Sequence, residues 1–391
     1  MFYLFNTIKH KEIMDYFNIA VMNDNDKESF ISSLISISLD LGFRGNLWKD
    51  YIIYTLIFND NYYTRAIERN KDAVVIDLVK ADLKEYYKLY CAKYSFLKAV
   101  SNFEFPGRTT VCSKAVEALV KSIGNSYESF EKNIIDFYVN KGLANMSLYK
   151  AFRVGDGKLS PIYNVDDEVS FDDLIGYESQ KKTLIENTLN FVSDKPANNV
   201  LLYGDSGTGK STSIKALLNM FFDKGLRIIE IYKHEMQEIS KIINTLRNRP
   251  YYYVIYMDDL SFEEDEGEYK YLKSIIEGGI EPKPNNVLIY ATSNRRHLIK
   301  ENYDDNQDLH RRETEAEKLS LAYRFGLQIF YSSLSPKEFK DMVLELAKKN
   351  NLKVDENVLI EEANIWQMSF GALSGRCATQ FIKHMTDKYN G

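Results

Sequence analysis

The segment LLYGDSGTGKST (residues 201–212) limits the fold of this 391-residue chain more than any other. Gly204 is followed by four residues and then by Gly209, Lys210 and Ser211, which is the pattern G-x-x-x-x-G-K-[ST] of a phosphate-binding loop, or P-loop. The run NNVLLY before it predicts a strand, and STSIKALLNMFF after it predicts an amphipathic helix. The sequence therefore predicts the strand, turn and helix that this motif requires.

The residue types of this loop suit the phosphates of a nucleotide. Glycines let the backbone wrap around phosphate with its N–H groups pointing inward, and the positive end of the following helix favours the anion. We expect Lys210 to reach the β- and γ-phosphates and the Ser211 hydroxyl to ligate Mg²⁺. The predicted phosphate-binding residues are Gly204, Asp205, Ser206, Gly207, Thr208, Gly209, Lys210, Ser211 and Thr212.

Short apolar runs alternate with helical stretches after residue 170. The runs are NVLLYG, LRIIEIY, YYVIYMDD and NVLIYATSN. Runs of this kind, separated by helices, are typical of a parallel sheet buried on both faces. We therefore predict an α/β nucleotide-binding domain over residues 171–334. Residues 335–391 are predicted to form a helical C-terminal domain, because SPKE offers Ser335 as N-cap and Glu338 to complete a capping box.

Two aspartates end the run YVIYMDD. A P-loop site needs a carboxylate at the end of a neighbouring strand to hold Mg²⁺, and a group that orients the attacking water. We assign Asp258 to the metal and Asp259 to the water. The carboxylates that follow, from Glu263 to Glu268, are interpreted as a solvated surface loop.

Residues 1–152 predict an all-helical N-terminal domain. In SKAVEALVKSIGNSYESFEKNIIDFYVNKG, apolar residues recur at spacings of three and four. This N-terminal half contains nearly equal numbers of basic and acidic residues, and no catalytic motif is found in it. Gly155, Gly157 and Pro161 then interrupt the pattern, and we expect a linker over residues 153–170.

Composition narrows the class of protein. A hydrophobic fraction of 45% is typical of a folded chain. The net charge of −6 argues against binding of nucleic acid through the overall charge of the chain. The three cysteines lack metal-like spacing, which suits a reducing compartment. The apolar runs fall short of the ~18 residues of a membrane span. We expect a cytoplasmic protein that does not bind membranes.

Beyond the P-loop, residues 170–390 resemble AAA+ ATPases. FDDLIGYESQK looks like the family's opening segment, in which Ile175 and Gly176 lie against the adenine. Asn294 ends the run NVLIYATSN at the position of the polar sensor-1 residue, which touches the γ-phosphate or the water. Arg324 is placed like the arginine finger that enters a neighbouring subunit's site, and Arg376 like the sensor-2 arginine of the lid.

The segments DDLSFE, YKYLKSIIEGG, TSNRRHLIKE, EKLSLAYRFGL and SGRCATQFI resemble more closely a bacterial group known as domain of unknown function 815. Two departures from AAA+ patterns matter. Many members carry Glu where this chain has Asp259, which is one methylene shorter. The stretch EIYKHEMQEISKIINTLRNRP also lacks the aromatic–hydrophobic–glycine triplet of members that thread peptides.

The resemblance implies ATP and Mg²⁺ as cofactors and a homo-oligomer, expected to be a hexamer. Our leading hypothesis is an ATP hydrolase that remodels a protein client recruited by the N-terminal domain. One alternative is a helicase-loader-like ATPase that contacts nucleic acid through the basic residues Arg295, Arg296, His297, Lys300, Arg311 and Arg312. Another is a nucleotide-dependent scaffold with slow turnover.

Overall fold

The structure is a computed structural model. It describes residues 10–23, 26–68, 73–104, 109–247, 249–262, 268–277, 283–295, 298, 321–370 and 373–390. The chain forms two units, Met1–Tyr149 with Asn248–Pro250, and Lys150–Arg247 with Tyr251–Gly391. In the described residues, no helix combines the length and hydropathy needed to cross a membrane.

The first unit is helical, as predicted. The helices of its described residues are α1 (Lys11–Met22), α2 (Lys27–Leu41), α3 (Leu47–Ile57), α4 (Tyr62–Glu68), α5 (Ala73–Tyr90), the 3₁₀ helix η2 (Ser95–Val100), α6 (Val111–Ser122), α7 (Tyr127–Lys141) and α8 (Ala144–Leu148). Every residue of α3 except Lys49 is buried, as expected for a helix whose apolar side chains are spread around its whole circumference. Trp48 of α3 stacks on Phe17 with ring centroids 4.3 Å apart, and the Tyr138 hydroxyl donates to the Leu56 carbonyl. Aromatic side chains such as these thus fill much of this core.

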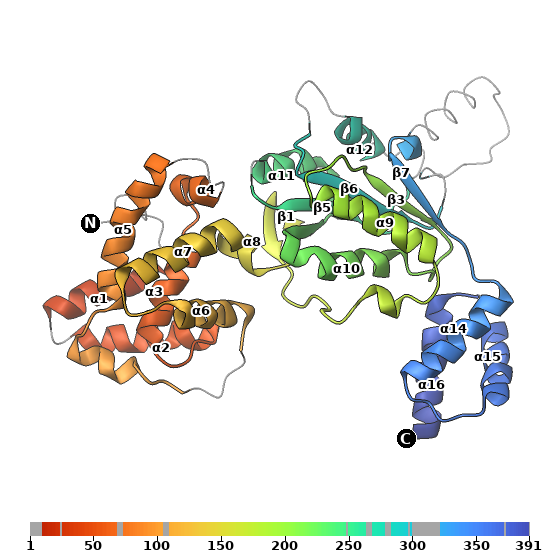
Figure 1. Ribbon diagram of the computed structural model, residues 1–391, viewed down its shortest axis with the longest axis horizontal. Helices are drawn as coiled ribbons and strands as arrows, with labels where there is room; N and C mark the ends of the chain where they lie inside the picture. Colours follow the sequence, from red (N-terminus) through yellow and green to blue (C-terminus); the bar gives the residue numbers. More distant parts are fainter. Residues whose placement is uncertain are drawn as a thin grey trace. The chain divides into compact units, whose positions relative to one another are not determined.

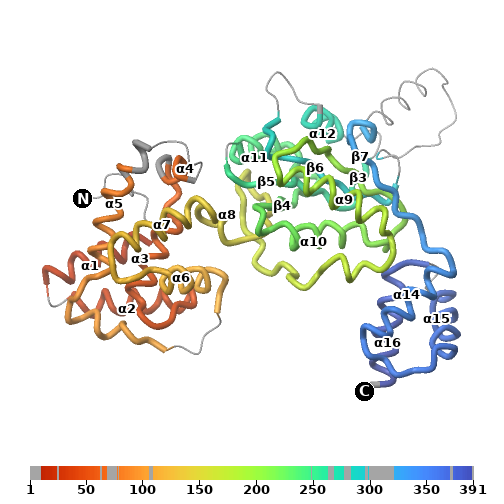
Figure 2. Tube along the Cα trace, viewed as in Figure 1, coloured from red at the N-terminus to blue at the C-terminus, as the bar shows by residue number. Residues whose placement is uncertain are grey.

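A seven-stranded sheet forms the frame of the second unit. Its strands are β1 (Ala151–Gly155), β2 (Lys158–Pro161), β3 (Val200–Gly204), β4 (Leu226–Glu230), β5 (Tyr252–Met257), β6 (Val287–Ser293) and β7 (Leu327–Tyr331). They follow the order β2-β1-β4-β5-β6-β3-β7, and all neighbours are parallel except β1 and β2. Figure 2 traces β4 beside β5. The predicted α/β class is confirmed, and the four predicted runs form β3, β4, β5 and β6.

Both faces of this sheet are covered. Val200 and Leu202 of β3 pack in one cluster with Leu217 and Phe221 of α10 (Lys210–Phe221), whereas Leu201 between them is equally buried. Because successive strand residues point to opposite faces, the run must be apolar throughout. Figure 1 shows α9 (Glu178–Phe191) and α10 lying along the sheet. The described residues of this region also contain η3 (Phe171–Asp173), η4 (Phe222–Lys224), η5 (Lys233–Glu238), α11 (Ile239–Leu246) and α12 (Glu268–Glu277).

Residues 153–170, expected as a linker, begin with a β-hairpin that belongs to the sheet. The turn between β1 and β2 places Asp156 and Gly157 at φ values of 49° and 66°, and β1 pairs in parallel with β4. An Asp-Gly pair with both φ angles positive is a favoured two-residue hairpin turn. Pro161 ends β2 at the edge of the sheet, where its missing N–H breaks no ladder hydrogen bond. The linker prediction is therefore wrong over residues 153–161, which belong to β1, the turn and β2.

Three helices form the C-terminal lid, α14 (Pro336–Lys349), α15 (Glu356–Phe370) and α16 (Gly375–Asn390). The predicted capping box is present, with the Ser335 hydroxyl accepting from the Glu338 N–H and the Glu338 carboxylate accepting from the Ser335 N–H. Phe339 and Val343 of α14 pack with Phe381 of α16 in a core of their own.

Candidate functional site

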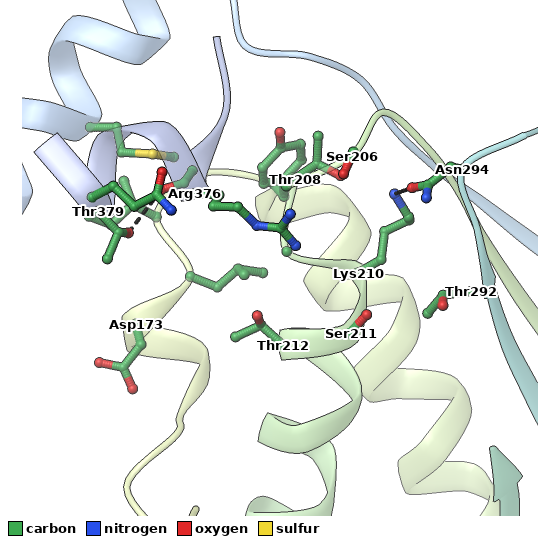
Figure 3. Close-up of a pocket in the computed structure, with 18 of the residues that line it drawn as sticks. Asp173, Ser206, Thr208, Lys210, Ser211, Thr212, Thr292, Asn294, Arg376 and Thr379 are labelled. Atoms are coloured by element: carbon green, nitrogen blue, oxygen red, sulfur yellow. Dashed lines mark hydrogen bonds between the residues drawn. The ribbon is translucent and has the colours of Figure 1, made fainter. Parts of the chain in front are cut away.

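A cavity of about 650 Å³ lies where the carboxyl ends of β3, β5 and β6 meet the lid. In open parallel sheets this edge is the usual place for ligands. Figure 3 shows side chains from the loop after β3, the end of β6 and the lid helix α16 around it. The lining residues are Asp173, Leu174, Ile175, Tyr177, Ser206, Gly207, Thr208, Gly209, Lys210, Ser211, Thr212, Asp258, Asp259, Thr292, Asn294, Met342, Leu346, Gly375, Arg376, Thr379 and Gln380.

The loop between β3 and α10 has the glycine conformations that a P-loop requires. Gly204, Gly207 and Gly209 have φ values of 131°, 75° and 94°, a region that other residues rarely adopt. A Cβ on Gly204 would lie 2.0 Å from the Tyr331 carbonyl oxygen. Space as well as conformation therefore restricts this position to glycine.

The Lys210 ammonium group bridges the loop and β6. It donates to the Gly204 and Asp205 carbonyls at 2.8 and 2.7 Å, and to Asn294 Oδ1 at 3.1 Å. Burial lowers the pKa of Lys210, while the carboxylates of Asp205, Asp259 and Asp258 act against that shift.

Asp258 follows β5 and meets α10 and β6 at one oxygen. Its Oδ1 accepts from the hydroxyls of Ser211 at 2.7 Å, Tyr256 at 2.7 Å and Thr292 at 2.5 Å. Burial raises the pKa of Asp258, but these hydrogen bonds outweigh it and the net shift is downward. The carboxylate is therefore ionised and next to the Ser211 hydroxyl, as a pair of oxygen ligands for a hard cation would be.

Asp259 occupies the left-handed region at φ 48°, which Asp tolerates better than most residues. Its N–H donates to Thr292 Oγ1 at 2.9 Å, and its Oδ1 accepts from Asn294 Nδ2 at 2.7 Å. Lys210, Asn294 and Asp259 thus form a continuous hydrogen-bonded chain across the cavity.

The opposite side of the cavity is more apolar. Ile175 and Tyr177 line it together with Met342 and Leu346 of α14. Gly176 has φ 80° and does not line the cavity. A flat aromatic group fits between such side chains better than a charged group does.

Arg376 is brought to the cavity by the lid. Its backbone N–H donates to the Gly207 carbonyl at 3.1 Å, so the first turn of α16 contacts the P-loop directly. Figure 3 shows its side chain extending from the lid toward the P-loop. Charge repulsion from Arg376 also contributes to the lowered pKa of Lys210, after burial.

Other predicted site residues lie away from the cavity wall. Gly204 and Asp205 do not line it, and the Asp205 carboxylate accepts from the N–H and hydroxyl of Ser333. Arg324 precedes β7, whose carboxyl end pairs with Gly204. The five residues of β7 rise ~16 Å in all, so Arg324 lies at the opposite edge of the sheet from the P-loop of its own chain.

A protein-family model described as "Protein of unknown function (DUF815)" matches residues 146–389, well over half of the chain. The chain belongs to this family. The resemblance to domain of unknown function 815 is thereby confirmed. The match begins at residue 146, so most of the helical unit lies outside the part that defines DUF815.

The DUF815 chain is also similar to the replication factor C large subunit of Nanoarchaeum equitans (strain Kin4-M), with 22% identity over 200 residues. The similarity covers 49% of this chain and 40% of that subunit, so the chain spans about two fifths of its relative's length. Among solved structures, Thermotoga maritima RuvB, a Holliday junction branch migration motor, matches with 16% identity and a TM-score of 0.33. That match covers 56% of this chain and 72% of RuvB, and a RuvB mutant gives a TM-score of 0.36.

Several site residues were not predicted from the DUF815 sequence. Tyr256 and Thr292 bind the Asp258 carboxylate, and Thr379 and Gln380 line the cavity from α16. Alternation along β5 and β6 places Tyr256 and Thr292 on the face of Asp258 and Asn294, but only the strand order brings the two strands together. Residues 263–267 of the acidic loop and Arg296, His297, Lys300, Arg311 and Arg312 of the basic cluster lie outside the described residues.

Proposed function

We propose that this DUF815 chain binds ATP with Mg²⁺ and hydrolyses it. The observation that carries the proposal is the convergence of Lys210, Ser211 and Asp258 at one cavity. The Ser211 hydroxyl and the ionised Asp258 carboxylate lie 2.7 Å apart, and both are oxygen donors of the kind that Mg²⁺ takes. The residues present therefore fit Mg²⁺, which when bound would neutralise phosphate charge.

The predicted residues that line the cavity have separate roles in this proposal. The P-loop backbone and Lys210 hold the phosphates, and Ile175 packs against the adenine. Asp259 orients the attacking water, because its carboxylate faces the cavity and is held by Asn294. Asn294 and Arg376 stabilise negative charge that develops on the γ-phosphate.

Assembly is a second part of the proposal. Arg324 lies too far from its own P-loop to serve it, so we assign it to the site of an adjacent copy. Such head-to-tail contacts generate rings or open helices. We propose a hexameric ring whose helical unit, outside the family match, recruits a protein client for remodelling.

The nucleic-acid alternative draws on the similarity to a replication factor C subunit. In that case the cluster that begins at Arg295 would contact phosphates, and binding to DNA would weaken steeply as salt rises. A fluorescence anisotropy titration with single- and double-stranded DNA at several salt concentrations separates the two proposals. ATP binding with negligible phosphate release would instead favour a scaffold.

Thermal melts with and without ATP test the nucleotide site. Saturation at about 100 times the dissociation constant stabilises a protein by about 2.7 kcal/mol, so wild-type chain should melt at a higher temperature with Mg–ATP. Lys210→Ala should remain folded but lose this shift, because the charge opposite the phosphates is gone. Lys215→Ala, on an exposed position of the same helix, is the matched control and should keep it. An equal ATP-induced shift in Lys210→Ala would overturn the P-loop assignment.

A further inference from the structure

Three hydroxyl groups from three elements converge on one oxygen. Ser211 of α10, Tyr256 of β5 and Thr292 of β6 all donate to Asp258 Oδ1, at 2.7, 2.7 and 2.5 Å. An ionised carboxylate has about two acceptor sites on each oxygen. Three donors are therefore one more than Oδ1 accepts with good geometry, and the loss of one donor would still leave Oδ1 with two hydrogen bonds.

The three donor hydroxyls differ in how easily each can turn away from Asp258. Thr292 Oγ1 also accepts from the Asp259 N–H at 2.9 Å, which fixes the Thr292 hydroxyl as a donor to Asp258. The Tyr256 ring is buried in the sheet–α10 core with 7% of its surface exposed, so its hydroxyl cannot swing away. Ser211 lines the cavity in the first turn of α10, and a rotation of one side-chain bond redirects its hydroxyl.

We propose that Tyr256 is a positioning residue for the metal-binding carboxylate. With Thr292, it occupies both acceptor sites of Asp258 Oδ1, so that Oδ2 and the Ser211 hydroxyl would be the groups available to hold Mg²⁺. This inference rests on the proposed function. Outer hydrogen bonds of this kind orient a metal-binding carboxylate, and their loss typically weakens metal affinity or activity ~10–100-fold.

The variant Tyr256→Phe tests the role because it removes the hydroxyl and keeps the ring. Tyr290→Phe is the matched control, since the Tyr290 hydroxyl is also buried in β6 but is bonded to Asn187 and Thr188 away from the cavity. Binding of a fluorescent ATP analogue would be titrated against Mg²⁺, beginning in EDTA. Equilibrium binding is the readout, so the test does not depend on turnover.

Tyr256→Phe should bind the analogue in EDTA within about twofold of wild type and require roughly tenfold more Mg²⁺ for the tight complex. Tyr290→Phe should keep the wild-type Mg²⁺ requirement even where its melting temperature falls. An unchanged Mg²⁺ requirement in Tyr256→Phe, or the same increase in both variants, overturns the positioning role and leaves the proposed function standing. A wild-type chain that binds no analogue in either condition contradicts the proposed function itself, and the inference with it.

Discussion

The residues around the cavity hold its charges in place through short contacts within the chain. Lys210 donates to Oδ1 of the Asn294 amide, and Nδ2 of the same amide donates to the Asp259 carboxylate. An amide can do this because it offers an acceptor and donors on one planar group. The Lys210 cation, proposed to face the phosphates, and the Asp259 carboxylate, proposed to face the water, are therefore fixed relative to each other by a single side chain.

Asp259→Asn separates the charge of this carboxylate from its shape. Asn tolerates the left-handed backbone at least as well as Asp, and its side-chain oxygen can still accept from Asn294. We expect nucleotide affinity to stay within a few fold while hydrolysis falls about 100-fold or more, since the group that polarises water has lost its charge. Phosphate release at saturating Mg–ATP, beside analogue binding, measures both. Wild-type turnover in this variant would mean that another residue orients the water.

At the level of elements, the P-loop depends on how closely β3 and β7 approach. Gly204 pairs with Tyr331, whose carbonyl oxygen accepts from the Asp205 N–H at 3.1 Å. The same carbonyl occupies the space where a Cβ on residue 204 would lie. The turn from strand into loop is therefore set by a neighbouring strand as much as by the loop's own residues.

Gly204→Ala should destabilise the second unit more than Gly225→Ala. Both glycines have positive φ, and alanine at either position carries a conformational penalty of about 1–2 kcal/mol. At Gly225 the added Cβ meets only Tyr252 at 3.7 Å, whereas at Gly204 it would meet backbone at 2.0 Å. Overpacking adds about 1–3 kcal/mol, so chemical denaturation should show that much extra loss for Gly204→Ala. Equal losses of unfolding free energy in the two variants would show that β3 and β7 move apart around the added Cβ without an energetic penalty.

Over the whole molecule, one chain supplies an incomplete site in our proposal. Arg324 lies at the amino edge of the sheet and the P-loop at the carboxyl edge, so a finger and a P-loop meet only between copies. The planar guanidinium group matches phosphate oxygens and stabilises charge that develops during transfer. Activity should then rise with protein concentration.

Two inactive variants should complement each other. Arg324→Ala keeps an intact P-loop and Lys210→Ala keeps an intact finger, so mixed assemblies contain some complete sites. We expect part of the ATPase activity to return on mixing, while each variant alone stays near background. Light scattering would establish that the variants co-assemble. Co-assembly without recovered activity, or full activity of a strictly monomeric wild-type sample, would refute a finger that acts between copies.

Local chemistry is what the sequence by itself determined. The P-loop pattern, the apolar runs of β3 to β6 and the Ser335 capping box each depend on residues close together in the chain, and each was predicted. The β1–β2 hairpin was missed because glycine and proline serve linkers and tight turns alike, and only pairing with β4 distinguishes them. Thr292 was missed because it meets Asp258 only where β5 and β6 lie side by side. Tyr256 lies two residues before Asp258 and was missed because its apolar run predicts only a buried strand residue. Only the tertiary structure decided that Ser211 and Thr292 donate to the same Asp258 oxygen and that Arg324 lies at the amino edge of the sheet. Both features depend on the order of the strands, and that order is set by contacts between residues far apart in the sequence.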